Sequence, residues 1–287
     1  MALMAACSDD DTFTTSRSNL LSFQTDTLRL DTTFSNVPTS TKTFWVYNRS
    51  GDGLRLNSVR LEQGNQTGFR VNVDGVELSA ANGYQANGLE VRDKDSIRVF
   101  VEMTSPRNNA ATPQLLTDNL AFTLESGVQQ KVNLRIYSWD AELVKGRKIT
   151  SNTTLTGTRP IVFQDTLKVE AGATLTIPAG MTVYFSNKAA IDVYGTLHCE
   201  GTADKPVTLR GDRLDKLFPY LPYDRVSGQW HGIRFHKDSY DNSLTHTDIH
   251  STYDGILCDT ATTAQTKLTL ANSTVHNCQG YGLQAIN

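Results

Sequence analysis

Three short segments in the second half of the chain share a pattern in which a glycine precedes an apolar, strand-like stretch. They cover residues 232–235, 255–258 and 282–285. The steps from Ile233 to Ile256 and from Ile256 to Leu283 are 23 and 27 residues, about the length of one turn of a parallel β-solenoid. One such coil cannot bury its apolar face alone, so the pattern predicts several coils stacked on one another.

The same alternation of apolar and polar positions continues upstream. Leu175 and Ile177 are followed by a Pro-Ala-Gly turn and then by Val183 and Phe185. Short strands separated by tight turns indicate a coil in which each strand pairs in parallel with its equivalent about 4.8 Å away. We therefore expect a right-handed, single-stranded parallel β-helix over residues 146–287.

The later coils predict the register of this stack. Alignment of THTDIHSTYDGILC with ANSTVHNCQGYGLQA places Ile249 over Val275 and His250 over His276. The sequence ends at Asn287 inside a coil that matches earlier ones, and no capping segment follows. Because an uncapped solenoid exposes open strand edges, we expect the natural protein to be longer and this β-helix to be incomplete.

The first half of the chain alternates in a different way. About seven short apolar-polar runs, separated by turn sequences rich in Gly, Asn and Asp, lie between residues 20 and 145. This number of strands in that length predicts an immunoglobulin-like β-sandwich. Arginines between the inward apolar positions suit a solvated sheet face, where their stems cover apolar surface. A basic patch for acidic glycans is the alternative.

Composition supports an all-β protein and narrows the classes of partner. The 287 residues carry a net charge of −3, which argues against a nucleic-acid binder. The chain contains no stretch of about 18 apolar residues, so the sequence predicts no membrane-spanning helix. Apart from Cys7, the chain has three cysteines, Cys199, Cys258 and Cys278, which cannot all pair with one another. The first two fall at inward positions, so we expect free buried thiols. A disulfide between Cys258 and Cys278 is the alternative, and no cofactor is indicated.

We expect the N-terminus to be an export and lipidation signal rather than part of the fold. Leu3, Met4 and two alanines precede Cys7, and this run resembles a bacterial lipobox, in which the cysteine becomes acylated. Ser8, Asp9, Asp10 and Asp11 resemble the export signal of Bacteroidetes lipoproteins that reach the outer face of the outer membrane. The hydrophobic run is short and lacks a basic start, so a chance cysteine in an acidic tail is the alternative. Residues 1–19 are expected to be a signal remnant and tether.

Two longer segments extend the resemblance. Residues 41–75 resemble the Ig-like domains of bacterial surface proteins, and residues 195–209 with 228–233 look like the opening coils of right-handed parallel β-helix proteins, notably Bacteroidales surface lipoproteins. The resemblance implies a pectin lyase-like fold and an outer-membrane, lipid-anchored, surface-exposed location. Members of this family differ in activity, so no function follows from it.

The most individual feature of the second half is an insertion at residues 211–229, GDRLDKLFPYLPYDRVSGQ. It concentrates aromatic side chains beside charged ones, and exposed aromatic rings are what the flat faces of sugars stack on. The alternative, which is favoured, is a loop that folds over the side of the solenoid, buries Phe218 and Leu221, and is held by Arg–Asp pairs. The candidate ligand-binding residues are Phe218, Tyr220, Tyr223, Arg225 and Trp230.

A second candidate site lies on successive late coils. His246, Asp248 and His250 are expected to alternate outward, and His276 lies one coil further on. Together they could bind a metal ion, which needs three or four ligands with supporting contacts. Polar residues are also the ordinary occupants of outward solenoid positions, and this second interpretation is favoured.

The predicted function is non-catalytic binding of glycans or host surface molecules by a displayed β-helix. The alternatives are a polysaccharide lyase or glycoside hydrolase, whose catalytic residues lie on the solenoid face or in missing coils, and a purely structural display scaffold. Catalysis would require converging outward carboxylates. The spacing of the outward acidic residues indicates no such pair, and no catalytic residue is assigned among Asp238, Asp241, Asp248, Asp254 and Asp259.

Overall fold

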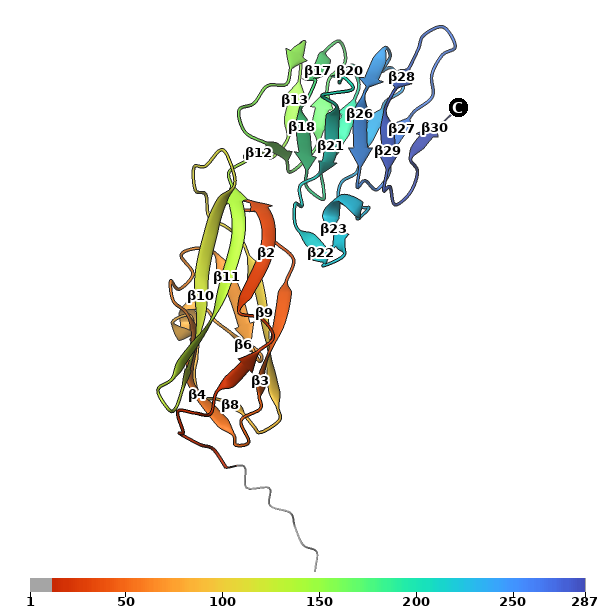
Figure 1. The fold of residues 1–287 in the computed structure, drawn as a ribbon. Coiled ribbons are helices and arrows are strands. Elements are labelled where there is room, and N and C mark those ends of the chain that lie inside the picture. The colour runs from red at the N-terminus through yellow and green to blue at the C-terminus, as the bar shows by residue number, and fades with distance from the viewer. Residues whose placement is uncertain (1–11, 287) are drawn as a thin grey trace, which may run out of the picture. The chain divides into compact units, whose positions relative to one another are not determined.

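The computed structural model describes residues 12–286, and its regular secondary structure is almost entirely β-strand, as expected (Figure 1). Contacts divide the chain into two units, one of residues 1–106 and 113–138 and one of residues 107–112 and 139–287. We call their described parts the two-sheet unit and the coil unit. The boundary lies at Ser138–Trp139 rather than at 145–146, because the strand at Glu142–Val144 already pairs with the first coil. Cys7 and the acidic run 8–11 lie outside the described residues.

The two-sheet unit consists of two antiparallel sheets around one hydrophobic core. The first sheet has the order β1 (Leu21–Phe23), β3 (Lys42–Asn48), β9 (Ser96–Met103), β5 (Phe69–Val73) and β6 (Val76–Glu77). The second has the order β2 (Thr27–Phe34), β11 (Gln129–Trp139), β10 (Gln114–Leu124), β4 (Leu54–Leu61) and β7 (Gln85–Ala86), with β8 (Leu89–Val91) also paired to β4.

The alternation of apolar and polar residues with a period of two places the apolar side chains in this core. In β4, Leu54, Leu56, Val59 and Leu61 are buried, while the residues between them are partly or fully exposed. The break in strict alternation after Leu56 coincides with a register shift opposite β10 between Thr123 and Leu124. Such a bulge restores the inward direction of the following side chains.

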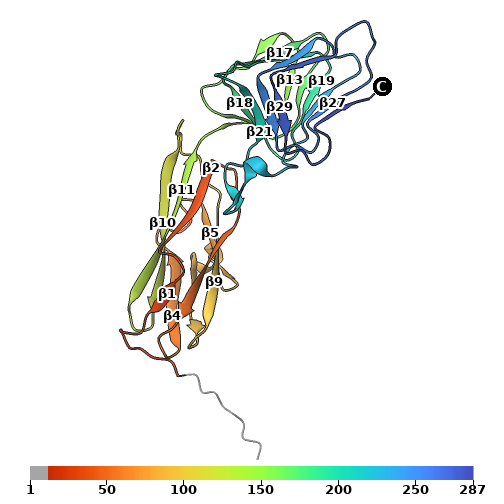
Figure 2. The ribbon, with the colours of Figure 1, turned by 45° about the vertical axis from the view of Figure 1, so that its right-hand side comes forward.

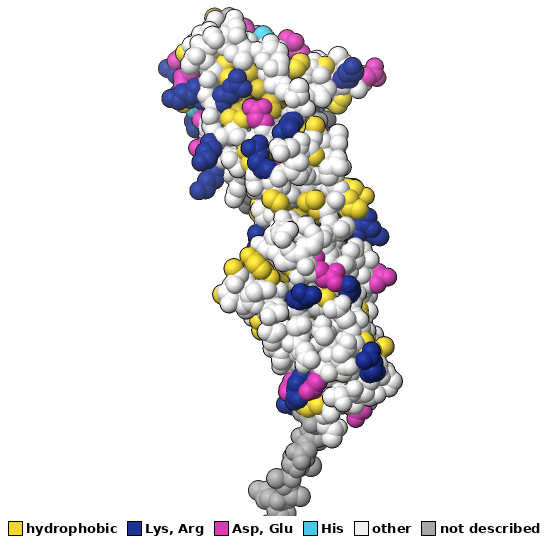
Figure 3. Space-filling view, turned by 90° about the vertical axis from the view of Figure 1, so that its left-hand side faces the viewer, with side chains coloured by type: hydrophobic (Ala, Val, Ile, Leu, Met, Phe, Trp, Pro, Cys, Tyr) yellow, Lys and Arg dark blue, Asp and Glu magenta, His cyan; other side chains and the backbone are white. Residues whose placement is uncertain are grey.

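The arginines of this unit lie on solvated sheet faces. Arg70 pairs with Glu102 at 2.8 Å, and the Arg98 guanidinium lies over the Phe100 ring at 4.9 Å. Figure 3 shows basic side chains dispersed over the drawn face of the two-sheet unit, several of them beside acidic ones. These contacts favour the interpretation of a solvated face over that of a basic patch.

The coil unit consists of three parallel sheets, to which successive turns of the chain add one strand each, as in a β-solenoid (Figures 1 and 2). The first sheet has the order β12 (Glu142–Val144), β15 (Ile161–Phe163), β18 (Thr182–Phe185), β21 (Val207–Gly211), β26 (Thr247–His250) and β29 (Thr274–His276). The second has the order β13 (Arg147–Ile149), β16 (Leu167–Val169), β19 (Ile191–Val193), β24 (Ile233–Phe235), β27 (Ile256–Cys258) and β30 (Leu283–Ala285). The third has the order β14 (Thr153–Thr154), β17 (Thr174–Pro178), β20 (Thr196–Glu200), β25 (Asn242–Thr245) and β28 (Leu268–Ala271).

The predicted register of the late coils is confirmed. Ile233 pairs with Ile256 and Ile256 with Leu283, while Ile249 pairs with Val275. Inside the coils, the Phe185 ring stacks on Phe163 and on Trp230, with centroids 5.8 and 4.2 Å apart. Successive coils therefore place equivalent side chains directly above one another.

A close backbone approach explains the glycine before β24. Gly232 has φ +82°, and a Cβ atom there would lie 1.8 Å from the carbonyl oxygen of Asp254 on the next coil. Only glycine combines this left-handed conformation with so close a contact. At Gly232 the glycine of the sequence pattern is thus required by the stacking of the coils.

The insertion forms a small hairpin on the side of the coil unit. β22 (Lys216–Phe218) pairs antiparallel with β23 (Leu221–Pro222), and a 3-10 turn, η2 (Tyr223–Arg225), follows directly. Cys199, Cys258 and Cys278 are free, and the first two are buried, as predicted. Among residues 12–286, no helix has the length and apolar character needed to cross a membrane.

Candidate functional site

The hairpin of residues 216–222, which we call the aromatic hairpin, presents two stacked rings to solvent. Tyr220 is 77% exposed and Phe218 is 48% exposed. Their ring centroids are 5.6 Å apart and the ring planes differ by 14°. The expectation that Phe218 is buried under a folded-over loop is wrong, because the short hairpin turn directs both rings outward.

The base of the aromatic hairpin is fixed by polar contacts. Arg213 donates to both carboxylate oxygens of Asp215, from Nε at 2.9 Å and from a terminal nitrogen at 2.8 Å, and Asp215 is buried. The Arg213 guanidinium also lies over the Tyr223 ring, 4.1 Å from its centroid. Gln229 Nε2 donates to the carbonyl of Val226 at 2.8 Å. The Arg–Asp pairs expected to hold this loop are therefore present.

The other predicted ligand-binding residues occupy different environments. Tyr223 is half-buried beneath Arg213, and Arg225 is exposed on η2. Trp230 is fully buried, stacks on Phe185 and donates from Nε1 to the carbonyl of His250 at 2.9 Å. Its prediction as a ligand contact is corrected: the indole fills the core of the coil and is inaccessible to a ligand.

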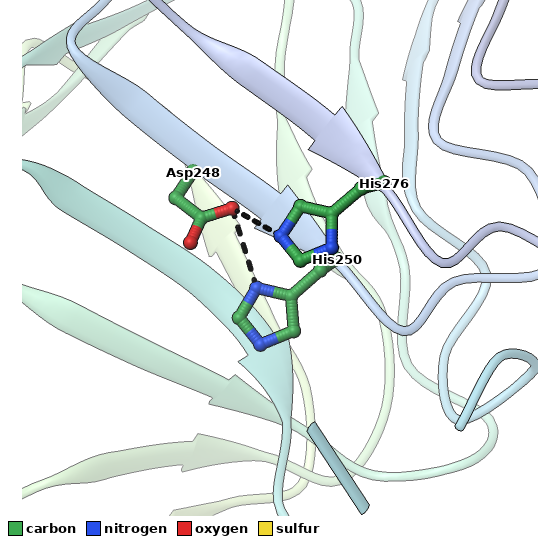
Figure 4. A group of neighbouring side chains, drawn as sticks. All are labelled: Asp248, His250 and His276. Carbon is green, nitrogen blue, oxygen red and sulfur yellow. Dashed lines mark hydrogen bonds and ion pairs between the residues drawn. The ribbon is translucent and has the colours of Figure 1, made fainter. Parts of the chain in front are cut away.

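A cluster of side chains, Asp248, His250 and His276, lies on β26 and β29 (Figure 4). We call it the histidine cluster. Asp248 Oδ1 lies 2.9 Å from His276 Nε2 and 3.4 Å from His250 Nδ1. The two imidazole rings stack with centroids 4.9 Å apart, because His250 and His276 are register partners on adjacent parallel strands. The predicted stacking of these histidines is confirmed.

The insertion adds a second carboxylate on the other side of His250. Asp224 on η2 places Oδ1 3.6 Å from His250 Nε2. Arg210 on β21 forms an ion pair with the same carboxylate. Ser251 Oγ and Asn277 Nδ2 donate to the Asp224 carbonyl at 3.1 and 3.0 Å, so the position of η2 is fixed from two later coils.

The alternation along the sequence predicted the wrong environment for two of the four candidate metal ligands, His250 and His246. His250 was expected to face outward, but its side chain is only 7% exposed, because η2 of the insertion covers it. His246 lies before β26 with φ 44° and is not part of the histidine cluster. Asp224 had no detectable signal as a partner of this group, since the path of an insertion does not follow the coil register.

The charged side chains of His250, Asp224 and Asp248 shift one another's pKa values. Burial disfavours the charged form of His250, but the carboxylates of Asp224 and Asp248 outweigh burial and raise the pKa of His250. His250, aided by Arg210, lowers the pKa of Asp224 although burial opposes this. Burial acts to raise the pKa of Asp248, but His250 and His276 outweigh it and lower that pKa. This arrangement therefore favours ionised Asp224 and Asp248 on either side of a protonated His250.

The remaining acidic candidates have contacts suited to structure. Asp259 lies 3.1 Å from Arg234 and 3.5 Å from His236, and Asp254 Oδ1 accepts a hydrogen bond from the Tyr281 amide at 2.9 Å. Asp238 and Asp241 are exposed, and Asp241 has φ 55° in the turn before β25. Of the five, only Asp248 joins the histidine cluster.

Comparisons with known proteins place this chain in no family. No protein-family model matches it, and no curated protein matches it. Among solved structures, a family 123 glycoside hydrolase from Clostridium perfringens is 7% identical with a TM-score of 0.27, and the match covers 42% of this chain and 26% of that one. The VesB protease of Vibrio cholerae is 15% identical with a TM-score of 0.24, covering 43% and 33%. BcpA, the major pilin subunit of Bacillus cereus, is 14% identical with a TM-score of 0.19, covering 46% and 43%.

The match therefore spans less than half of each of these structures. TM-scores this low carry no inference about fold or function, and the site must be interpreted from its own residues.

Proposed function

We propose that this protein is a non-catalytic binding module that recognises glycans through the aromatic hairpin. One observation carries the proposal: the stacked Phe218 and Tyr220 rings stand in solvent on a hairpin with a fixed base. Monomeric proteins rarely expose grouped aromatic surface without a use for it in binding.

The chemistry of the hairpin suits a sugar. The faces of aromatic rings stack on the apolar faces of pyranose rings, and the phenolic hydroxyl of Tyr220 can exchange hydrogen bonds with sugar hydroxyls. Lys216, at the start of the hairpin, and Arg225, on η2, are exposed, and such cations can pair with a carboxylate or sulfate of an acidic glycan. Because the base of the hairpin is already ordered, little conformational entropy is lost on binding.

The proposal includes the architecture and location expected from the sequence. The two-sheet unit serves as an Ig-like spacer, and the coil unit is a right-handed β-helix of the pectin lyase-like kind, the hand that parallel strand crossovers almost always take. Acylation of Cys7 anchors the chain in outer-membrane lipid and displays it on the cell surface, where host or neighbouring-cell glycans are the partners and nucleic acid is not.

A glycan array with the full chain tests this function. Wild type is compared with Phe218→Ala and Tyr220→Ala, and with Tyr137→Ala as a matched exposed tyrosine in the two-sheet unit, where it is 44% exposed. We expect wild type and Tyr137→Ala to bind one class of glycan and both hairpin variants to lose at least tenfold in affinity.

Reducing ends and unsaturated products are measured in the same samples. Release of product from any polysaccharide would overturn the proposal in favour of a carbohydrate-active enzyme. Absence of binding by wild type would overturn it in favour of a display scaffold.

A further inference from the structure

We propose that Asp248, His250 and His276 bind one divalent first-row transition-metal ion, of which Zn²⁺ is the type. This site is separate from the aromatic rings, and the proposal does not depend on glycan recognition.

The ligand atoms already lie near the spacing that such an ion requires. Ligands about 2.0–2.1 Å from a tetrahedral zinc ion are separated from each other by about 3.3 Å. Asp248 Oδ1 lies 3.4 Å from His250 Nδ1 and 2.9 Å from His276 Nε2, and the three ligand atoms all lie within 4.8 Å of one another. A bound ion requires the two stacked imidazole rings to rotate so that the lone pairs of both ligating nitrogens converge on it, and a fourth position would take water or a ligand.

The buried imidazole of His250 supports the assignment independently. Its side chain is 7% exposed, and its ring nitrogens face carboxylate oxygens of Asp248 and Asp224 at 3.4 and 3.6 Å without forming a hydrogen bond of ordinary geometry to any described residue. Buried polar atoms are rarely left without a partner, because the loss of hydration is not compensated. An ion bound at Nδ1 would supply that compensation.

The opposite side of the ring has the arrangement that supports a metal-bound histidine. Such a histidine usually gives its second ring proton to a carboxylate, which fixes the tautomer and raises the basicity of the ligating nitrogen. Nε2 of His250 faces Asp224 Oδ1 at 3.6 Å, and Arg210 pairs with that carboxylate. Asp224 is thus a supporting residue that orients His250 and is not itself a ligand.

The donor set selects the class of ion. Two imidazoles and one carboxylate suit Zn²⁺, Co²⁺, Ni²⁺ or Cu²⁺, whereas Ca²⁺ and Mg²⁺ take oxygen ligands only. The competing occupant of this space is a proton on His250, held between Asp224 and Asp248 with no ion bound. A metal requires the His276 nitrogen, while a protonated His250 does not, so His276 distinguishes the two.

The experiment uses the full chain with Cys7→Ser, so that this thiol cannot bind metal, and with any affinity tag removed. After chelator treatment and dialysis, Co²⁺ is added while the visible absorption spectrum is recorded, and Zn²⁺ binding is followed by calorimetry. We expect one equivalent to bind, with d–d absorption typical of tetrahedral or five-coordinate cobalt that Zn²⁺ abolishes and excess Ca²⁺ or Mg²⁺ does not.

Three substitutions locate the ion. His276→Ala, at a half-exposed position, should abolish the cobalt spectrum, and Asp224→Asn should weaken Zn²⁺ binding about 10- to 100-fold while the spectrum persists. His231→Ala removes an exposed histidine outside the cluster and should change neither. Circular dichroism shows that each variant is folded. Absence of one-equivalent binding, or equal losses in His276→Ala and His231→Ala, would overturn the proposal.

Discussion

His250 and His276 occupy equivalent positions on adjacent strands of one parallel sheet, and their imidazole rings stack 4.9 Å apart. This distance is close to the spacing between neighbouring β-strands, so the backbone ladder itself sets the separation of the two side chains. In a coil, any residue type repeated at one position thus becomes a column of closely spaced functional groups. In the histidine cluster this column consists of His250 and His276, and Asp248, on the strand of His250, completes the cluster.

Metal binding should stabilise the coil unit. An ion that binds only the folded state adds about 2.7 kcal/mol to the free energy of unfolding at a concentration 100-fold above its Kd. We expect Zn²⁺ to raise the midpoint of one calorimetric unfolding transition and to leave the other unchanged. His276→Ala should abolish the shift, and a shift of equal size in that variant would place the stabilising ion elsewhere.

Removal of the charge of Asp215 should loosen the aromatic hairpin. Asp215→Asn leaves the half-buried Arg213 guanidinium without its carboxylate, and loss of one partner of a buried pair costs about 3–5 kcal/mol. We expect trypsin to cleave at Arg213 and Lys216 at least tenfold faster than in wild type, with weaker glycan binding. Asp204→Asn, at an exposed position in a turn of the same unit, is the matched control. Cleavage at the wild-type rate would show that the pair does not order the hairpin.

Trp230 should be more important for stability than for binding. Its indole stacks on Phe185 and is the hydrogen-bond donor to the His250 carbonyl, so Trp230→Phe keeps most of the packing but removes that donor. A buried acceptor left without a partner costs about 1–3 kcal/mol, which denaturant unfolding of the coil unit measures. Trp45→Phe, at a position 36% exposed in the two-sheet unit, should leave the coil transition unchanged. An unchanged coil transition in Trp230→Phe would contradict this role.

The sequence predicts the coils well because the same inward positions recur from one coil to the next. The steps from Ile233 to Ile256 and to Leu283 correspond to pairs in one sheet, since each coil must bury the same inward position. The predictions that failed concern residues in or beside the insertion at 211–229, which follows no repeat. Asp224 reaches His250, and Phe218 faces solvent, because of a local hairpin whose path alternation does not encode. Trp230 follows this insertion directly, which makes it resemble a loop residue although it belongs to the core.

The stability of the two-sheet unit should depend on pH through Asp118. Burial raises the pKa of this carboxyl, although backbone amides of Gln63 and Asn119 donate to Oδ1 at 3.2 and 2.7 Å and act in the opposite direction. Oδ2 is buried and has no hydrogen-bond partner among the described residues. Because the folded state holds the proton more tightly than the unfolded state, this group favours folding at low pH. Its contribution is lost as pH rises from about 4 through the folded pKa.

Asp118→Asn removes that titration while it keeps the Oδ1 acceptor. We expect the difference in unfolding midpoint, variant minus wild type, to increase between pH 4 and pH 7, since only wild type bears a growing cost of burying charge. Any constant cost of the new amide group shifts the whole difference and leaves its slope unchanged. Glu62, whose pKa is lowered chiefly by Lys131, titrates in both proteins, and its charge adds a smaller repulsion to that of ionised Asp118 in wild type alone. A flat difference across this range would show that Asp118 ionises at its ordinary pKa and that its burial carries no charge penalty.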